Sequence, residues 1–295
     1  MKLAAETTLT PEIRNLASGH SLVLLAPDNG VLPPRFGRAE VDTRRYDSLL
    51  HAMQRMRGAI YLRDGAITPS QLESDGRHVV DADRISWHVL SLNNGGQVTG
   101  CSRYLCHEQD ASFEELTVGH ASLVHDPAWG RRFRKAIESE VANARADNLA
   151  FVEVGGWAVH ESLRFTTEAL RVALSTYALA RWLGGCIGIT TATVRNCSSR
   201  ILRKIGGTPL QLDGARIPPY YDPRYRCEME VLRFDSRRPD SRFLPWIEPI
   251  YRQLAGAPVV WRTTKVARPI PVHPRAATWD YAVPQACLQW RAASS

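Results

Sequence analysis

Two adjacent segments of this 295-residue chain carry residue types that could bind a phosphate. Two glycines interrupt the apolar run LAFVEVGGWAV (149–159), and an R-x-x-T-x-A sequence follows it. It consists of Arg164, Thr167 and Ala169, and Thr166 adds a second threonine within it. The free N–H groups of a helix N-terminus, threonine hydroxyls and the forked guanidinium of arginine can all bind pyrophosphate oxygens. The match is weak when taken alone, because threonine and glutamate also form an ordinary first turn of a helix. Its position directly after a glycine-broken strand predicts an enzyme that handles a phosphorylated carrier.

The double glycine itself allows two interpretations. Glycine within a buried strand costs stability unless a bulge or a close backbone approach requires it. A bulge at Gly155 and Gly156 would turn the amides of Trp157, Ala158 and Val159 away from the strand ladder and toward a ligand. Tight packing against a neighbouring helix is the alternative, and the glycines by themselves favour neither.

The surrounding sequence predicts helices and strands that would hold this stretch in place. Hydrophobic periodicity indicates helices over residues 43–57, 131–146, about 166–183 and about 195–205. Apolar runs indicate strands over residues 85–92, 97–106, 149–159, 186–193 and 227–234. An Asn-Asn-Gly-Gly turn joins the first two of these strands into a hairpin. Residues 113–125 are ambiguous, and a short strand is expected within 116–124.

Periodicity and proline content divide the chain into three parts. Residues 1–42 show little periodicity and are expected to form an irregular N-terminal segment. Residues 43–236 contain the alternating strands and helices of an α/β domain. Residues 237–295 are rich in proline and are expected to form an extended C-terminal appendage.

Composition restricts the class of protein. Apolar residues make up 44% of the chain and charged residues 23%, which is typical of a soluble globular protein. No run approaches the ~20 apolar residues of a membrane-spanning helix, and the segment SLVLLA (21–26) lacks the flanks of a signal peptide. These features predict a cytoplasmic protein. The formal charge of +7 favours an acidic partner, such as nucleic acid, an anionic membrane surface, a phosphate-bearing cofactor or an acidic protein.

Several other kinds of site are disfavoured. The six cysteines form no C-x-x-C pair and the nine histidines no H-E-x-x-H motif, so we expect no metal site and interpret the cysteines as reduced thiols. No G-x-S-x-G elbow of a serine hydrolase is present. The basic helix expected over 195–205 follows a strand rather than a helix, unlike a helix-turn-helix unit that reads DNA.

From the glycine-broken strand onward, the chain resembles the GNAT acyl-CoA N-acyltransferase superfamily. That family has a bulged fourth strand, a Q/R-x-x-G-x-G/A loop, a long helix, a fifth strand and a further helix. The loop would be residues 164–169 here, with Thr167 in place of the middle glycine. The resemblance covers about residues 45–235 and implies a mixed, twisted central sheet with a splayed strand pair, flanked by helices. Leu202 stands where many acetyltransferases carry the tyrosine that protonates the departing thiolate, which weakens a simple acetyltransferase reading.

Two further segments are similar to one branch of that superfamily. GCSRYL (100–105) and VEVGGWAV (152–159), with acidic residues at Asp81 and Asp83, look like the N-acyl-homoserine-lactone synthases and the related N-acyl amino acid synthases. The second arginine of the lactone-synthase strand is Gly156 in this chain. The resemblance therefore favours an N-acyl amino acid synthase.

This resemblance implies direct acyl transfer from a thioester to an amine, in a cleft lined by Arg103 and Glu153. Arg103 would bind substrate, and Glu153 would take the proton that the amine loses, with a pKa raised by burial. The amides of residues 157–159 would polarise the thioester carbonyl. The alternative is that Glu153 is paired with Arg103 for structure alone.

The implied acyl donor is a phosphopantetheine thioester, either of acyl carrier protein (acyl-ACP) or of CoA, with no metal. Acyl carrier protein is acidic, and the candidates for its docking face are Arg131, Arg132, Arg134, Lys135, Arg200, Arg203 and Lys204. Each of these could equally belong to a solvated helix face. Two other functions stay open, an acetyl-CoA-dependent N-acetyltransferase and a non-catalytic module that binds acyl-CoA or nucleic acid.

Overall fold

The elements of the fold follow the expected alternation of strands and helices. The computed structural model describes residues 19–28, 36, 38–108 and 110–262. The helices are α1 (Thr43–Arg63), α2 (Gly130–Ala146), α3 (Thr167–Trp182), α4 (Ser198–Lys204) and α5 (Leu244–Gly256). The longer strands are β1 (Ser21–Leu25), β3 (Trp87–Leu92), β4 (Val98–His107), β5 (Ala150–Val159), β6 (Cys186–Thr193) and β11 (Cys227–Asp235). The short strands are β2 (Ala39–Val41), β7 (Thr208–Pro209), β8 (Gln211–Leu212), β9 (Ala215–Arg216), β10 (Tyr220–Asp222) and β12 (Val259–Trp261).

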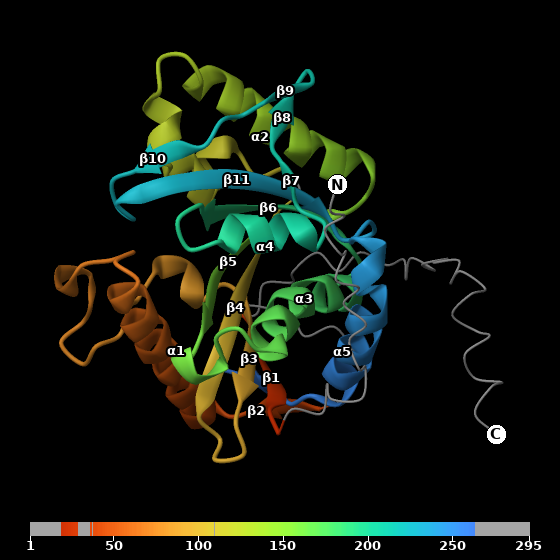
Figure 1. Ribbon diagram of the computed structural model, residues 1–295. Coiled ribbons are helices and arrows are strands. Elements are labelled where there is room, and N and C mark those ends of the chain that lie inside the picture. The colour runs from red at the N-terminus through yellow and green to blue at the C-terminus, as the bar shows by residue number, and fades with distance from the viewer. Residues whose placement is uncertain (1–18, 29–35, 37, 109, 263–295) are drawn as a thin grey trace, which may run out of the picture.

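One ten-stranded mixed sheet organises the molecule. Its order is β10-β11-β6-β5-β4-β3-β1-β12-β2, with β7 paired to β11. The pairs β5·β6, β1·β12 and β12·β2 are parallel, and the other pairs are antiparallel. The α/β class with a mixed, twisted sheet flanked by helices is therefore confirmed (Figure 1).

Helices cover both faces of the sheet because the strands are apolar on both sides. On one face, α3 and α5 pack with Val152 and Tyr104 in a common core. On the other face, α1 packs against Cys101 and Leu90, and α2 packs against Phe151. Figure 1 shows α1 on one side of the strands and α3 with α5 on the other. Neighbouring residues of β5, Phe151 and Val152, thus belong to different cores, as the alternation of a strand requires.

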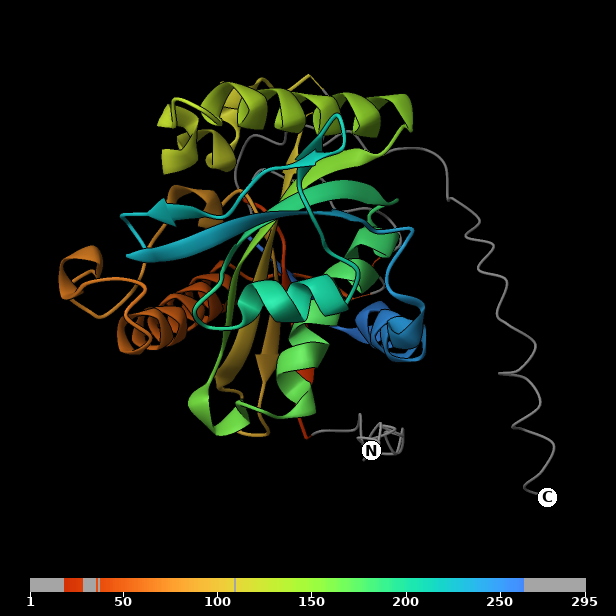
Figure 2. The ribbon, with the colours of Figure 1, turned by 45° about the horizontal axis from the view of Figure 1, so that its top comes forward.

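The sheet divides in its middle, between β5 and β6. These two strands pair in parallel from Ala150 with Cys186 to Glu153 with Ile189, and no further. Beyond that point β5 continues beside β4 as far as Val159, while β6 continues beside β11 as far as Thr193. Figures 1 and 2 show the two halves of the sheet diverging from this point. The splayed pair predicted by the resemblance is present.

Both chain ends differ from expectation. β1 and β2 lie in the N-terminal segment expected to be irregular, and both are strands of the main sheet. α5 and β12 lie in the expected C-terminal appendage, yet β12 pairs in parallel with β1. The described parts of both end segments therefore complete the central sheet. Their short runs and several prolines hid this pairing, because partners far apart in sequence leave no local pattern.

Two local expectations are also corrected. The short strand expected within residues 116–124 is absent, and three 3₁₀ turns occupy Phe113–Glu115, Thr117–His120 and Ser122–His125. α4 begins at Ser198, three residues later than expected, because Cys197 at its N-cap has a left-handed φ of 61°.

Five of the six cysteines lie in the described residues, and all five are free thiols. Cys101, Cys186 and Cys227 are buried free thiols, Cys106 and Cys197 are partly exposed free thiols, and Cys287 lies outside the described residues. Among the described residues, no helix has both the length and the apolar character needed to cross a bilayer.

Gly188 on β6 provides a test of the packing between β6 and its neighbours. An added Cβ there would collide with the Phe234 ring and lie 2.6 Å from Val152 Cγ2. We expect Gly188→Ala to lower the free energy of unfolding by about 1–3 kcal/mol, because overpacking forces neighbouring side chains to shift. Urea denaturation measures this change. Gly256→Ala, where an added Cβ meets nothing within 4 Å, is the matched control and should leave the midpoint unchanged or raise it slightly, because alanine favours a helix more than glycine does. Equal midpoints for the two variants would contradict this account.

Candidate active site

A cavity of about 800 Å³ lies where β5 and β6 separate. Its lining includes the consecutive residues 153–159 of β5 and 189–193 of β6. Successive residues of a strand point to opposite faces of a sheet. The cavity is therefore open to both faces of the sheet, through the gap between the two strands.

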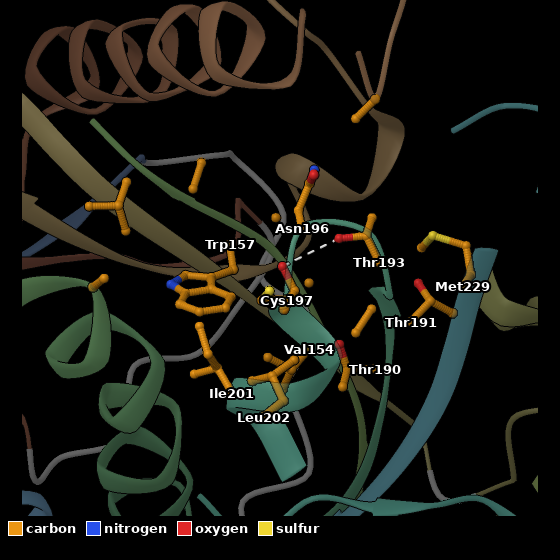
Figure 3. Close-up of a pocket in the computed structure, with 18 of the residues that line it drawn as sticks. Val154, Trp157, Thr190, Thr191, Thr193, Asn196, Cys197, Ile201, Leu202 and Met229 are labelled. Carbon is orange, nitrogen blue, oxygen red and sulfur yellow. Dashed lines mark hydrogen bonds between the residues drawn. The ribbon is translucent and has the colours of Figure 1, made fainter. Parts of the chain in front are cut away.

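The two sides of the cavity differ in chemistry. On the side of α1 and α2, the lining includes Glu153 and Arg103. On the side of α3 and α4, it is largely apolar, and Figure 3 shows Val154, Ile201 and Leu202 close together below the indole of Trp157. The hydroxyl-bearing wall of β6, which Figure 3 shows at Thr190, Thr191 and Thr193, borders the gap.

The double glycine forms the predicted bulge. Arg103 pairs with Gly155 and Cys101 with Ala158, so Gly156 and Trp157 together face a single residue of β4. Gly156 has a φ of +61°, the left-handed conformation that glycine adopts without a steric penalty. A Cβ on this residue would lie 3.2 Å from Arg103 Cβ. The bulge and the close approach of Arg103 together account for Gly156.

The bulge sets the direction of the amides that follow. His160 donates its N–H to the Thr99 carbonyl at 2.8 Å. Since the amides of an antiparallel strand alternate between its two edges, the Val159 N–H points to the edge that β6 has left, and the Ala158 N–H points back to β4. Of the predicted carbonyl-polarising amides, Val159 therefore has the suitable direction, whereas Ala158 does not. Trp157 contributes its indole to the cavity, and its Nε1 is buried with no hydrogen-bond partner among the described residues.

Glu153 is held rigidly at the branching point of the sheet. Its Oε1 accepts the Val118 N–H at 2.7 Å, and its Oε2 accepts the Thr117 N–H at 2.7 Å and lies 2.8 Å from His107 Nε2. Burial opposes ionisation, but the hydrogen bond and charge of His107 and the two backbone amides outweigh burial and hold the pKa of the Glu153 carboxyl below its usual value. The expectation that burial raises this pKa is therefore wrong.

Arg103 lies on the same side of the cavity but is not paired with Glu153. Its nearest carboxylate is Asp83, with Nη1 and Oδ1 3.9 Å apart. Asp83 itself is fully buried and accepts two hydrogen bonds from Arg57, at 2.8 and 2.7 Å, and one from Gln54 at 2.9 Å. Burial raises the pKa of Asp83, but the guanidinium of Arg57 outweighs it and lowers the pKa to about 2. Asp83 is thus satisfied by Arg57, and the Arg103 side chain, 13% exposed, keeps donors for a ligand.

The loop predicted to hold pyrophosphate is occupied by contacts within the protein. Arg164 Nη2 lies 2.6 Å from both carboxylate oxygens of Asp64, at the end of α1. The Thr166 hydroxyl donates to the Leu163 carbonyl at 2.6 Å and accepts the Glu168 N–H at 3.2 Å, which caps α3. Arg164, Thr166 and Ala169 line the cavity, whereas Thr167 does not. The R-x-x-T-x-A sequence therefore makes structural contacts beside the cavity.

Two non-glycine residues of the cavity have left-handed backbone conformations. Phe165 has a φ of 63° and a fully exposed ring, and Cys197 has a φ of 61°. Backbone conformations of this kind cost free energy and cluster at functional sites. Both residues line the cavity just before a helix, Phe165 before α3 and Cys197 before α4.

Sequence reasoning did not find the groups that hold the predicted residues in place. His107 and the amides of Thr117 and Val118 orient Glu153, and Arg57 neutralises Asp83. Arg57 lies at the end of the helix expected over residues 43–57, and its burial depends on the docking of α1. His107 follows Arg103 by four residues on the same strand, so alternation alone could have placed both on one face. Among the described residues, no group of three His, Cys, Asp or Glu side chains could hold a metal ion.

Several solved structures are similar to this chain. No protein-family model matches the chain, and no curated protein matches it. A CoA-dependent acyl-homoserine lactone synthase, BjaI, is 16% identical, with a TM-score of 0.48 over 88% of this chain and 99% of that one. FeeM, an N-acyl amino acid synthase from uncultured soil microbes, is 13% identical, with a TM-score of 0.39 over 67% of this chain and 88% of that one. A putative N-acetyltransferase from Lactobacillus plantarum is 8% identical, with a TM-score of 0.37 over 74% and 99%. The first two are of the branch that the sequence resembles.

The hydrogen bonds of Glu153 predict a pH-dependent contribution to stability. Because the pKa of the folded state lies below the usual 4.5, the contribution is complete above about pH 4.5 and is lost as pH falls through the folded-state value. Glu153→Gln should lower the free energy of unfolding at pH 7 by about 1–3 kcal/mol, since the amide group cannot accept all three hydrogen bonds. The difference between the wild type and Glu153→Gln should shrink between pH 5 and pH 3.

Urea denaturation at several pH values measures this difference. Glu161→Gln is the control, because the Glu161 side chain is 64% exposed and, among the described residues, its carboxylate pairs with Arg63, which is 36% exposed. Its replacement should change stability by less than about 0.5 kcal/mol. A constant difference between the wild type and Glu153→Gln over this pH range would contradict the assignment.

Proposed function

We propose that this protein is an N-acyltransferase that moves a long-chain acyl group from a phosphopantetheine thioester to the amine of an amino acid or a similar small molecule. The cavity between β5 and β6 is the observation that carries this proposal. It reaches both faces of the sheet, with a carboxylate and an arginine on one side and an apolar lining on the other. An acyl donor and a charged acceptor can therefore approach the same point from opposite faces.

The reaction requires a carbonyl between these two faces. The neutral amine of the acceptor attacks the thioester carbon, the C–N bond forms and the C–S bond breaks. The departing thiolate takes up a proton from solvent and becomes a thiol. Negative charge develops on the carbonyl oxygen during attack, and the Val159 N–H points into the gap where it could stabilise that charge. The apolar wall of Val154, Ile201 and Leu202 suits the acyl chain.

Glu153 would receive the proton that the nitrogen loses. Its low pKa keeps it ionised near neutral pH, so it can attract the ammonium group of the acceptor, which loses one proton to solvent before the neutral amine attacks. As the C–N bond forms, the nitrogen gains positive charge and becomes acidic, and a carboxylate of low pKa can then accept its proton directly or through water. Oε1 accepts only the Val118 amide among the described residues, which leaves a lone pair for this step.

Arg103 would bind the carboxylate of an amino acid acceptor. It lies beside the bulge, with Nη2 3.4 Å from the position of a Cβ on Gly155. Its Nε is buried without a hydrogen-bond partner in the part of the chain that the structure describes. A guanidinium with unused donors can form the forked contact that a carboxylate prefers.

Products extracted from a bacterial host that expresses the chain test the proposed function. We expect mass spectrometry to detect a new N-acyl amine with the wild type and with Glu161→Gln, and at least about a 100-fold smaller amount with Glu153→Gln, in line with loss of a general base. Circular dichroism confirms that each variant is folded. Folded, abundant wild type without a product would contradict long-chain transfer, and acetyl-CoA turnover or binding alone would then be the remaining functions.

Arg103→Gln tests the acceptor side separately. With the purified enzyme and its acceptor, we expect KM for the acceptor to rise about tenfold or more, as for loss of one charged hydrogen bond. KM for the acyl donor should stay within about twofold, because the donor occupies the other face. An equal rise of both KM values would contradict the division of the cavity into two sides.

A further inference from the structure

The basic residues of α2 and α4 differ in what surrounds them. On α2, Arg134 bonds to Glu138 and to Glu114 and lies over the Phe113 ring, and Arg132 lies over Trp129. None of the basic residues of α2 lines the cavity. Figure 2 shows α2 above β11 and α4 on the opposite side of that strand. The two basic helices therefore do not form one continuous docking face.

On α4, two cations lie at the border of the cavity. Arg200 and Lys204 are one turn apart and exposed, and both line the cavity together with Ile201 and Ile205. The apolar side chains of this face of α4 thus lie toward the interior of the cavity, and its two cations lie at the edge of the cavity. Neither cation is paired with a carboxylate: Arg200 contacts only the Cys197 thiol, at 3.6 Å, and Lys204 has no polar partner among the described residues.

The other groups that could bind phosphate at this mouth are already engaged. Both oxygens of Asp64 neutralise Arg164, and the Thr166 hydroxyl caps α3. The carboxylate of Glu168, in the first turn of α3, is buried and paired with Arg171, and it does not line the cavity. Two further exposed cations line the cavity: Arg195 donates to the Asp64 carbonyl at 2.9 Å, and Arg224 pairs with Asp222. Among the described residues, the exposed cations of the cavity without an oxygen partner are therefore the two on α4.

We infer that Arg200 and Lys204 bind the phosphate of the donor's phosphopantetheine arm, in place of the N-terminus of α3. This inference rests on the proposed acyltransferase function. The phosphate lies at the end of the arm opposite the sulfur, so the arm would pass from the cations at the edge, along Ile201, to the carbonyl in the gap. CoA and acyl carrier protein share this phosphate, and they are the two sources to be distinguished.

The double variant Arg200→Gln/Lys204→Gln tests this site. Arg131→Gln/Lys135→Gln on α2 is the matched control, because it removes the same two residue types at the same spacing from another exposed helix face. The donors are acyl-CoA, acyl carrier protein thioester and the N-acetylcysteamine thioester, which carries the acyl group without phosphate. KM for each donor is measured with the wild type and both variants.

We expect the α4 variant to raise KM about tenfold or more for whichever phosphate-bearing donor the wild type uses. KM for the N-acetylcysteamine thioester should stay unchanged in this variant, and the α2 variant should keep wild-type values for acyl-CoA and for the N-acetylcysteamine thioester. The donor that shows the rise identifies the source of the phosphate. Unchanged KM values in the α4 variant, or equal rises in both variants, would overturn the inference.

A binding measurement separates this inference from the proposed function. If the wild type transfers no acyl group from any donor, calorimetry with CoA and with phosphopantetheinylated carrier protein still tests the site. The inference predicts salt-sensitive binding of at least one of them, weakened about tenfold or more in the α4 variant only. No binding to the wild type, or equal binding to the α4 variant, would overturn it.

Discussion

The end of hydrogen bonding between β5 and β6 is the constraint on which the rest of the site depends. Up to Glu153 and Ile189 the two strands share a parallel ladder, and beyond these residues each strand stays with its other neighbour. Backbone N–H and C=O groups along the open edges then need water or a ligand, because buried groups without partners are costly. A gap in the middle of a sheet therefore provides a row of backbone donors and acceptors that ordinary sheet pairing would consume.

The bulge and the buried ion pair stabilise this opening from the side of β4. At the bulge, Gly156 takes a conformation that residues with a Cβ rarely adopt, and Arg103 packs directly against it. Arg103 is in turn placed near Asp83, whose charge is balanced by Arg57 from α1. A buried carboxylate is tolerated only with such partners. The docking of α1 therefore fixes the electrostatics of the cavity as well as the packing of the sheet.

Charge is distributed unequally around the cavity, and this asymmetry suits a reaction between a charged acceptor and a phosphate-bearing donor. The carboxylate of Glu153 lies at the closed end of the gap, where the strands still pair. The unpaired cations of α4 lie at the edge, beyond the apolar side chains of Ile201 and Ile205. In the proposed reaction, the cations of α4 would attract the donor's phosphate at the edge, and Glu153 with Arg103 would bind the acceptor at the other end.

Sequence alone determined the local elements, whereas the glycines by themselves left the bulge open and only the resemblance implied it. The strand over 149–159, the long helix after it and the hairpin before it are where the apolar patterns indicate, because each depends on residues close in the chain. The pKa of Glu153 and the partner of Arg103 could not be predicted in this way. They depend on His107, Thr117 and Asp83, which reach the site only when β4, a 3₁₀ turn and α1 are assembled around β5. Tertiary structure also brought β1 and β12 into one sheet, since pairing across more than 200 residues leaves no local signal. The sequence thus determines which residues lie close together along the chain. The electrostatic environment of each residue depends instead on which distant segments pack against it.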